Sequence, residues 1–115
     1  MSEATLGDVI LALKTDSLEV EVVPDYPRGL TRLDETSPAL VIIDEMLAVV
    51  NGWEACSRLR KITDVPIILL GDKRGGRAVA KAIDQGADVY LSKPCDSDEL
   101  KARVGALLRR YRRKT

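Results

Sequence analysis

The residue best placed to do chemistry in this chain is Asp44, which directly follows the aliphatic run of residues 40–43, Leu-Val-Ile-Ile. A continuous apolar run rich in β-branched residues predicts a strand that is buried on both faces. Such a strand belongs to a parallel sheet, and ligands bind parallel sheets at the carboxyl ends of the strands. A carboxylate at that end either takes part in chemistry or begins a polar turn, and the remaining residues must distinguish the two.

The composition excludes several kinds of active site. The 115 residues include no histidine and only two cysteines, Cys56 and Cys95. Without histidine, a Cys–His nucleophile and a Ser-His-Asp triad are excluded, and a zinc site is not expected. The two distant cysteines are expected to be reduced structural thiols.

Charge and hydropathy predict a single domain, residues 1–115, in the cytoplasm. Eighteen basic residues balance eighteen acidic ones, so the net charge attracts neither nucleic acid nor a membrane surface. Apolar residues make up 45% of the chain, which is enough for one core. No apolar run is long enough to cross a membrane, and no signal-peptide pattern is present.

Alternating strands and helices predict the scaffold that positions Asp44. We expect strands at residues 18–23, 39–43, 65–70 and 89–92, helices at 28–36, 52–61, 77–85 and 97–110, and a glycine-bearing loop at 71–76. Several residues mark the ends of these elements: Pro24 and Pro27 after the first strand, Asn51 with Glu54 at the helix from 52, Gly86 after the helix to 85, and Asp96 with Glu99 at the last helix. The alternation predicts an α/β sandwich with a parallel sheet flanked by helices.

The amino-terminal residues fit two interpretations. Leu6, Val9, Ile10 and Leu13 share one helical face, which favours a helix over residues 2–14. Residues 9–13 also fit a buried strand. Only four residues separate that run from residue 18, so the strand would have to form an antiparallel hairpin with residues 18–23.

Four segments, in order, resemble the receiver domain of bacterial response regulators, the phosphorylation-controlled module of two-component signalling. Residues 44–52, an aspartate with a Met-Leu turn and an Asn-Gly helix start, resemble its phosphoacceptor segment. Residues 64–70 resemble its fourth strand, and residues 86–94 resemble its fifth strand with the Lys-Pro ending. Residues 99–104 resemble the last helix in the winged-helix class of transcriptional regulators. The resemblance runs from residue 18 to 110 and implies a flavodoxin-like receiver sandwich.

The resemblance also implies roles for individual residues. Asp44 would accept a phosphoryl group from a sensor histidine kinase, and Lys93 would pair with that group. Gly71 stands where the family carries a hydroxyl that binds the phosphate, and Tyr90 stands at the aromatic that repacks with it. A magnesium ion would be held by Asp44, the backbone carbonyl of Met46 and two acids that end the first strand.

Two departures from the family pattern predict impaired switching. Gly71 has no side chain to reach a phosphate, and the first strand with its acidic pair has no gapless counterpart. If residues 9–13 replace that strand, it ends in Lys14, which would repel a metal ion. Glu45 and Asp72 lie close to the pocket in sequence. Either residues 9–13 or an element exchanged with a second chain would have to fill the place of the missing strand.

The resemblance further implies protein partners. Charged residues on elements that match the family's dimerisation face are Lys81, Asp88, Glu99 and Arg103. We therefore expect a homodimer that contacts a histidine kinase or another protein. The basic tail, residues 109–115, lacks interleaved aromatics beyond one tyrosine, so we expect it to lead towards an effector domain rather than to bind nucleic acid itself.

Three functions fit this pattern. The first is a non-enzymatic, degenerate receiver domain that regulates a partner without strong dependence on phosphate. The second is an active phosphoacceptor at Asp44. The third is an α/β phosphotransfer enzyme with Asp44 as the nucleophile. It ranks last, because such phosphatases carry a second aspartate two residues on, where this chain has Met46.

Overall fold

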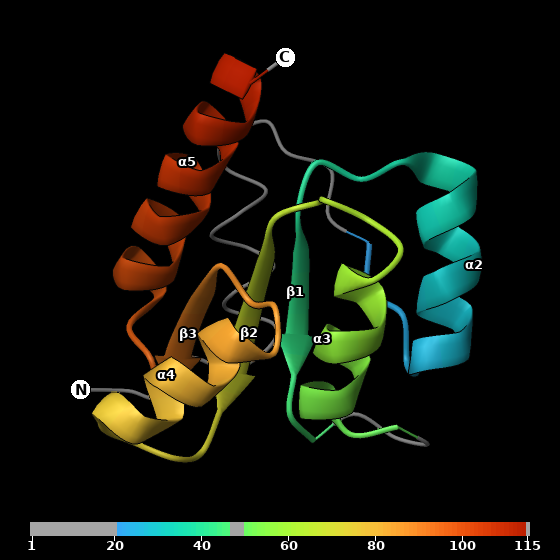
Figure 1. Cartoon of the computed structure of the whole chain (residues 1–115). Helices are drawn as coiled ribbons and strands as arrows, with labels where there is room; N and C mark the ends of the chain where they lie inside the picture. The colour runs from blue at the N-terminus through green and yellow to red at the C-terminus, as the bar shows by residue number, and fades with distance from the viewer. Residues whose placement is uncertain (1–20, 47–49, 115) are drawn as a thin grey trace. The chain divides into compact units, whose positions relative to one another are not determined.

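The elements of the chain alternate as the sequence predicts. The structure, a computed structural model, describes residues 21–46 and 50–114, with side chains to residue 110. In order, the elements are α2 (Tyr26–Thr36), β1 (Val41–Asp44), α3 (Gly52–Arg60), β2 (Ile67–Gly71), α4 (Gly76–Asp84), β3 (Val89–Ser92) and α5 (Ser97–Lys114) (Figure 1). The described residues fall into two compact units: residues 23–93 form one, and α5 belongs to the other with residues 21 and 22.

A parallel sheet forms the centre of the larger unit. Its three strands lie in the order β1-β2-β3. Both pairings are parallel, with Asp44 opposite Leu70 and Gly71 opposite Ser92. The carboxyl ends of all three strands therefore meet at one edge of the sheet, and the predicted parallel α/β architecture is confirmed.

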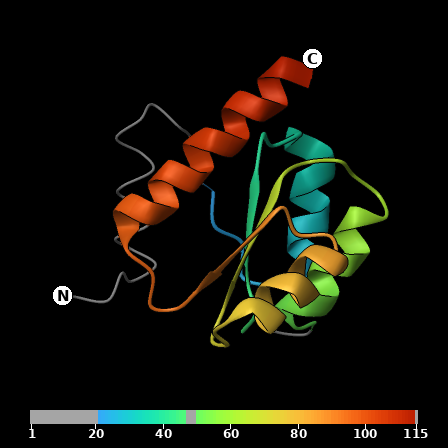
Figure 2. The ribbon, with the colours of Figure 1, turned by 60° about the vertical axis from the view of Figure 1, so that its left-hand side comes forward.

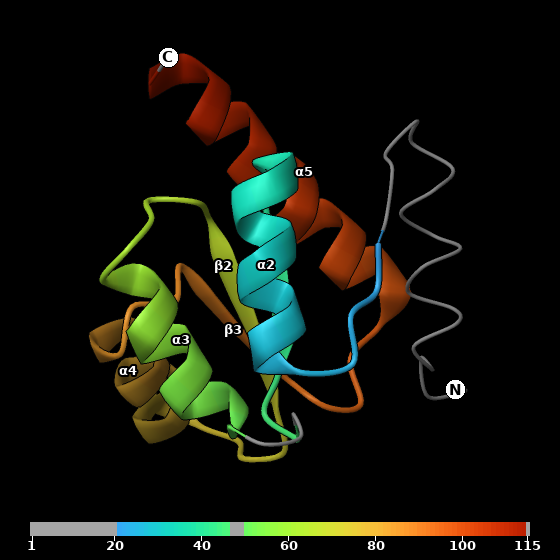
Figure 3. The same ribbon diagram turned by 90° about the vertical axis from the view of Figure 1, so that its right-hand side faces the viewer.

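The core of this unit lies between one face of the sheet and the three helices α2, α3 and α4 (Figure 2). Figure 3 views the unit from the helical side, with α2 and α3 in front of the strands. The strands contribute Ile43, Ile67, Leu69 and Tyr90 to this face. The helices meet them with small side chains as well as large ones: Tyr26, Ala55, Cys56, Leu59, Ala78 and Ala82. Small residues let the helix backbones lie close to the sheet, which holds the strand ends in place.

Three predicted element ends are confirmed. The Oδ1 atom of Asn51 accepts a hydrogen bond from the Glu54 amide at 2.9 Å, which caps α3. The Asp98 amide donates to Asp96 Oδ1 at 2.7 Å in the first turn of α5. Gly86 follows the end of α4 with a φ of 110°, a left-handed value that suits glycine.

The start of α2 corrects the prediction for this region. The helix begins at Tyr26 rather than at residue 28, because Asp25 caps it by accepting a hydrogen bond from the Arg28 amide at 2.9 Å. Pro27 lies in the first turn, where a missing N–H leaves no helical bond unmade. Residues 21–23 lie in no strand, and the rest of the strand predicted at 18–23 lies outside the described residues.

Other boundaries shift by a few residues. β1 covers Val41–Asp44 instead of 39–43, so Asp44 is the last residue of the strand. Gly71 ends β2 rather than opening the loop at 71–76. α5 continues to Lys114, past the predicted end at residue 110, since its arginines and lysines favour helix and no breaker follows.

The last helix has one buried apolar face. Leu100, Val104 and Leu107 of α5 are buried, whereas Leu108 is only half-buried.

The predictions for residues 2–14, including the missing or replaced first strand, lie outside the described residues. Among the helices that the structure describes, none is long and apolar enough to span a lipid bilayer.

Candidate functional site

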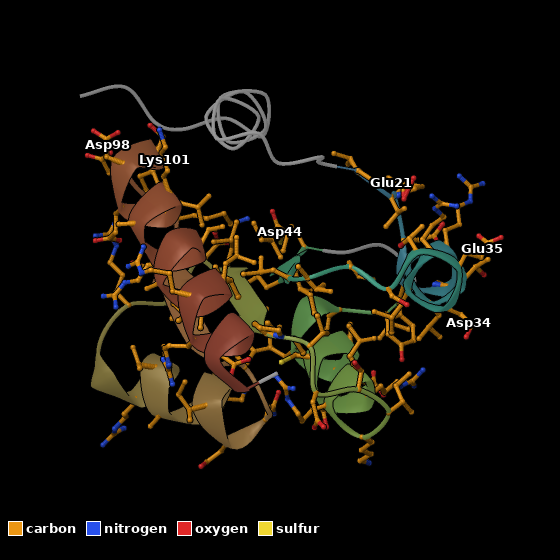
Figure 4. All side chains as sticks on the ribbon, turned by 90° about the horizontal axis from the view of Figure 1, so that it is seen from above. Glu21, Asp34, Glu35, Asp44, Asp98 and Lys101 are labelled. Carbon is orange, nitrogen blue, oxygen red and sulfur yellow. The ribbon has the colours of Figure 1, made fainter. Side chains whose placement is uncertain are left out.

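Asp44 lies at the carboxyl edge of the sheet and presents its carboxylate to solvent. Figure 4 labels it at the end of β1, with Asp34 and Glu35 projecting from α2 on the side away from it. Asp44 Oδ1 accepts hydrogen bonds from the Lys93 ammonium at 2.8 Å and from the Met46 amide at 2.9 Å. Its side chain is 48% exposed, so the carboxylate is held in place and remains accessible.

Lys93 faces two carboxylates. It directly follows β3, and its amide donates to the Gly71 carbonyl at 2.7 Å, which fixes the backbone beside β2. Its ammonium lies 2.8 Å from Asp44 and 3.8 Å from Asp72. Burial alone would lower the pKa of Lys93, but the hydrogen bond and charge of Asp44, with the charges of Asp72 and Glu45, raise it above its ordinary value. Lys93 is therefore a persistent cation at the acceptor.

Glu45 is held by two N–H donors from separate elements. Its Oε1 atom accepts a short hydrogen bond from the Asp72 amide, just after β2. Its Oε2 atom accepts from the Trp53 indole, on α3, at 3.2 Å. Sequence reasoning placed Glu45 and Asp72 near the pocket but missed Trp53. The usable signal was its position at the start of the helix that follows the Asp44 loop.

Gly71 and Tyr90 fit together closely. A β-carbon built on Gly71 would overlap the Tyr90 hydroxyl, and it would lie 2.8 Å from Tyr90 Cε1 and 3.0 Å from Glu45 Oε1. The Tyr90 hydroxyl donates to the Lys73 carbonyl at 2.7 Å, and its ring stacks on Trp53 with centroids 5.5 Å apart. The space of a side chain at position 71 is thus filled by Tyr90 and Glu45. Burial and the charge of Glu45 raise the pKa of Tyr90, which keeps the phenol protonated.

The four charged residues predicted on a dimerisation face have different surroundings. The Lys81 ammonium lies 4.9 Å from the centre of the Trp53 ring, a cation–π contact. Asp88 Oδ2 accepts from Arg60 at 2.7 Å and from the Ile67 amide at 2.8 Å, so this oxygen is occupied within the domain. Glu99 and Arg103 are exposed on α5. The dimerisation role itself stays a prediction.

The donors and acceptors at this edge suit an anionic group and supply part of a cation site. Carboxylate and carbonyl oxygens are the ligands that magnesium prefers, and Asp44 with the Met46 carbonyl offers them. Within residues 21–46 and 50–114, no group of three or more Asp, Glu, Cys or His side chains gathers to hold a metal. The prediction that the first strand lacks its acidic pair concerns residues outside that range.

Comparisons with known proteins place this geometry in a family. The family described as "Response regulator receiver domain" matches residues 4–105, which extends the resemblance seen at 18–110 towards the amino terminus. Among curated relatives, the DNA-binding response regulator MtrA of Mycobacterium tuberculosis is 37% identical over 109 residues, 94% of this chain and 48% of MtrA. The transcriptional regulatory protein CseB of Streptomyces coelicolor is 36% identical over 101 residues, 88% of this chain and 43% of CseB. The chain spans about half the length of these relatives.

Solved structures of receiver domains have the same fold as this chain. The BeF3-activated receiver domain of RstA from Klebsiella pneumoniae aligns with a TM-score of 0.80 at 27% identity, covering 93% of this chain and 94% of that one. The receiver domain of the Francisella response regulator 1452 aligns with a TM-score of 0.84 at 25% identity, covering 89% and 85%. The predicted flavodoxin-like receiver fold is confirmed.

Proposed function

The chain belongs to the response regulator receiver domain family, and on that premise we propose that it is a regulatory domain whose acceptor position is Asp44 and whose phosphate-dependent switching is impaired. The domain acts through contacts with other proteins rather than as an enzyme. Its named relatives are response regulators, two of them described as DNA-binding or transcriptional regulators.

The observation that carries this proposal is the overlap at Gly71. A receiver that responds to phosphate uses a hydroxyl at this position to bind a phosphoryl oxygen. Here Tyr90 occupies the space, and its own hydroxyl is committed to the Lys73 carbonyl. A phosphoryl group on Asp44 would therefore lack one stabilising donor. Tyr90 would also have no hydroxyl at position 71 with which to repack.

A second candidate, an active phosphoacceptor, is favoured by the contact between Lys93 and Asp44. Lys93 and the Met46 amide already orient the Asp44 carboxylate. In the transfer, a carboxylate oxygen of Asp44 forms a bond to phosphorus while the bond from phosphorus to the donor's leaving group breaks. Magnesium, held by Asp44 and the Met46 carbonyl, would supply charge neutralisation of the phosphoryl oxygens. An α/β phosphotransfer enzyme remains the last-ranked function, since Met46 stands where such enzymes have a second aspartate.

Membership of the family supports a proposal about partners. We propose a cytoplasmic homodimer, with Lys81, Asp88, Glu99 and Arg103 near its face, that receives signals from a sensor histidine kinase or another protein. Binding of nucleic acid would belong to a separate domain, as the names of the relatives suggest, and no membrane contact is proposed.

The two leading functions are separated by phosphorylation with a small donor. The protein is incubated with magnesium and acetyl phosphate, and its intact mass is compared with that of Asp44→Asn. Impaired switching predicts no phosphoryl adduct. An adduct that disappears in Asp44→Asn would overturn the degenerate function and support the active acceptor. Sustained turnover of a phosphate ester would be required for the enzyme.

A further inference from the structure

We propose that the Asp72 amide and the Trp53 indole form an anion seat beside Asp44, and that the Glu45 carboxylate occupies this seat as a built-in competitor of a phosphoryl group. What the proposal says about phosphate rests on the acceptor position proposed above. The seat and its occupant are properties of this chain's own contacts. Nothing in the resemblance to the family assigns them.

The two N–H donors of the seat converge on one carboxylate. The Asp72 amide comes from the end of β2 and the Trp53 indole from the first turn of α3, and each donates to a different oxygen of Glu45. The Gly52 amide donates to the Glu45 carbonyl at 3.1 Å, which ties the residue after β1 to the start of α3. Two converging N–H groups that bind both oxygens of one carboxylate are an anion-binding arrangement in general.

The seat lies next to the acceptor residue and to position 71. Glu45 adjoins Asp44 in the chain, and its Oε1 atom lies 3.0 Å from the point where a β-carbon of residue 71 would stand. The charge of Glu45 contributes to the raised pKa of Lys93, the residue whose ammonium binds Asp44. The carboxylate therefore lies in the same electrostatic field as the acceptor. It also fills the region from which a hydroxyl at position 71 would act.

Phosphorylation of Asp44 would add negative charge beside Glu45. A phosphoryl group brings roughly −1.5 to −2 charges and three strong acceptor oxygens. On Asp44 it would repel the neighbouring Glu45 and compete for the Asp72 amide. Displacing Glu45 would release the Trp53 indole, which is stacked on Tyr90 and lies beneath the Lys81 ammonium. The occupied seat thus opposes phosphorylation and links the acceptor to the α3 and α4 surfaces.

The test uses the only tryptophan in the chain, whose indole N–H gives a single resonance in a proton–nitrogen correlation spectrum. Wild type, Glu45→Ala and Glu45→Gln are compared. We expect the Trp53 indole and Asp72 amide signals to move upfield in Glu45→Ala, because a charge-assisted bond is lost, and to move less in Glu45→Gln. Glu54→Ala is the matched control. It removes an acid of the first turn of α3 whose carboxylate pairs with the exposed Arg58, and it should leave both signals in place.

Titration with inorganic phosphate then tests whether the seat accepts an anion. We expect the two signals to respond in Glu45→Ala and to stay fixed in wild type at the same concentrations. The proposal is overturned if the Trp53 and Asp72 signals of wild type and Glu45→Ala coincide, or if phosphate moves them equally in both proteins. Glu45→Gln keeps the test decisive should Glu45→Ala fail to fold.

A second measurement separates failure of the seat from failure of the acceptor. With magnesium and acetyl phosphate, acetate leaves as the phosphoryl group bonds to Asp44, and intact mass follows the adduct. We expect Glu45→Ala to accumulate adduct under conditions in which wild type accumulates none, because one competing bond and one neighbouring negative charge are removed. Equal accumulation in the two proteins would overturn the competitor role. An adduct in wild type that disappears in Asp44→Asn would instead overturn the impaired switching proposed above, and the resonances would still decide the seat.

Discussion

The two ends of the sheet carry ion pairs of similar length but different surroundings. At the amino end of β2, Arg60 and Asp88 lie 2.7 Å apart, and at the carboxyl edge Lys93 and Asp44 lie 2.8 Å apart. Arg60 also donates to the Gly86 carbonyl at 2.8 Å and to the Thr63 carbonyl at 3.2 Å. We call the contacts of Arg60 with Asp88, Gly86 and Thr63 the brace.

The difference lies in how fully each pair is satisfied. In the brace, the guanidinium reaches three acceptors, and Asp88 also accepts from the Ile67 amide. At the carboxyl edge, the Lys93 ammonium lies 2.8 Å from Asp44 and 3.8 Å from Asp72, and both acids are substantially exposed. A planar guanidinium with several fixed partners holds one geometry, whereas a single ammonium among several acids can change partner. We therefore expect the brace to be rigid and the Lys93 ammonium to exchange between Asp44 and Asp72.

The largest effect that tests this comparison is loss of the brace. Arg60→Ala should lower the free energy of unfolding by about 2 kcal/mol, because three hydrogen bonds are lost, one of them the ion pair with Asp88. Arg58→Ala is the matched control on the same helix. Its pair with Glu54 is exposed and its guanidinium lies 5.8 Å from the centre of the Tyr26 ring, so a smaller loss of about 1 kcal/mol is expected. Urea denaturation measures both, and equal losses would contradict the proposed rigidity of the brace.

The next effect concerns the close fit at the acceptor edge. Gly71→Ala should lower the free energy of unfolding by about 1–2 kcal/mol, because the new methyl group collides with the Tyr90 ring. Tyr90→Leu costs stability by itself, but it should relieve most of the collision in the double variant. Gly76→Ala is the control, since nothing lies within 4 Å of its added β-carbon. A double-mutant cycle without coupling between positions 71 and 90 would refute the fit.

A smaller effect is expected for the exposed pair itself. Asp44→Asn and Lys93→Ala should each change the unfolding free energy by about 0.5 kcal/mol or less, because solvent screens the pair. Urea denaturation of both variants beside Arg60→Ala measures the difference between the two ends of the sheet. A loss at Lys93 as large as that at Arg60 would show that the acceptor edge is a structural brace as well.

The smallest effect is a loss of stability at alkaline pH. The pKa values of Tyr90 and Lys93 are raised from 10.0 and 10.5, so the folded state holds both protons more tightly than the unfolded state. Their contribution is complete below those ordinary values and is lost as the pH rises through the raised ones. Denaturation midpoints measured from pH 8 to pH 11 should fall less in Tyr90→Phe than in wild type. If the midpoints of the two proteins fall in parallel with pH, Tyr90 does not contribute to the loss of stability at alkaline pH.

The sequence by itself determined the fold class, the position of Asp44 at a strand end and the residues that begin α3 and α5. These features depend on local patterns, such as an apolar run, a capping side chain or the spacing of a Lys-Pro ending, and local patterns are written in consecutive residues. Pro27 was the exception, because a proline suits both the end of a strand and the first turn of a helix. The Asp25 cap decided between the two.

Only the tertiary structure decided the partners at the two ends of the sheet. Tyr90 fills the space at Gly71, Glu45 joins the Asp72 amide to the Trp53 indole, and Arg60 reaches Asp88. These contacts join residues between 8 and 28 positions apart in the sequence. They depend on the parallel register that brings like ends of β1, β2 and β3 to the same edge of the sheet, and no local pattern encodes that register. The missing side chain at position 71 was visible in the sequence, but what occupies its place was not.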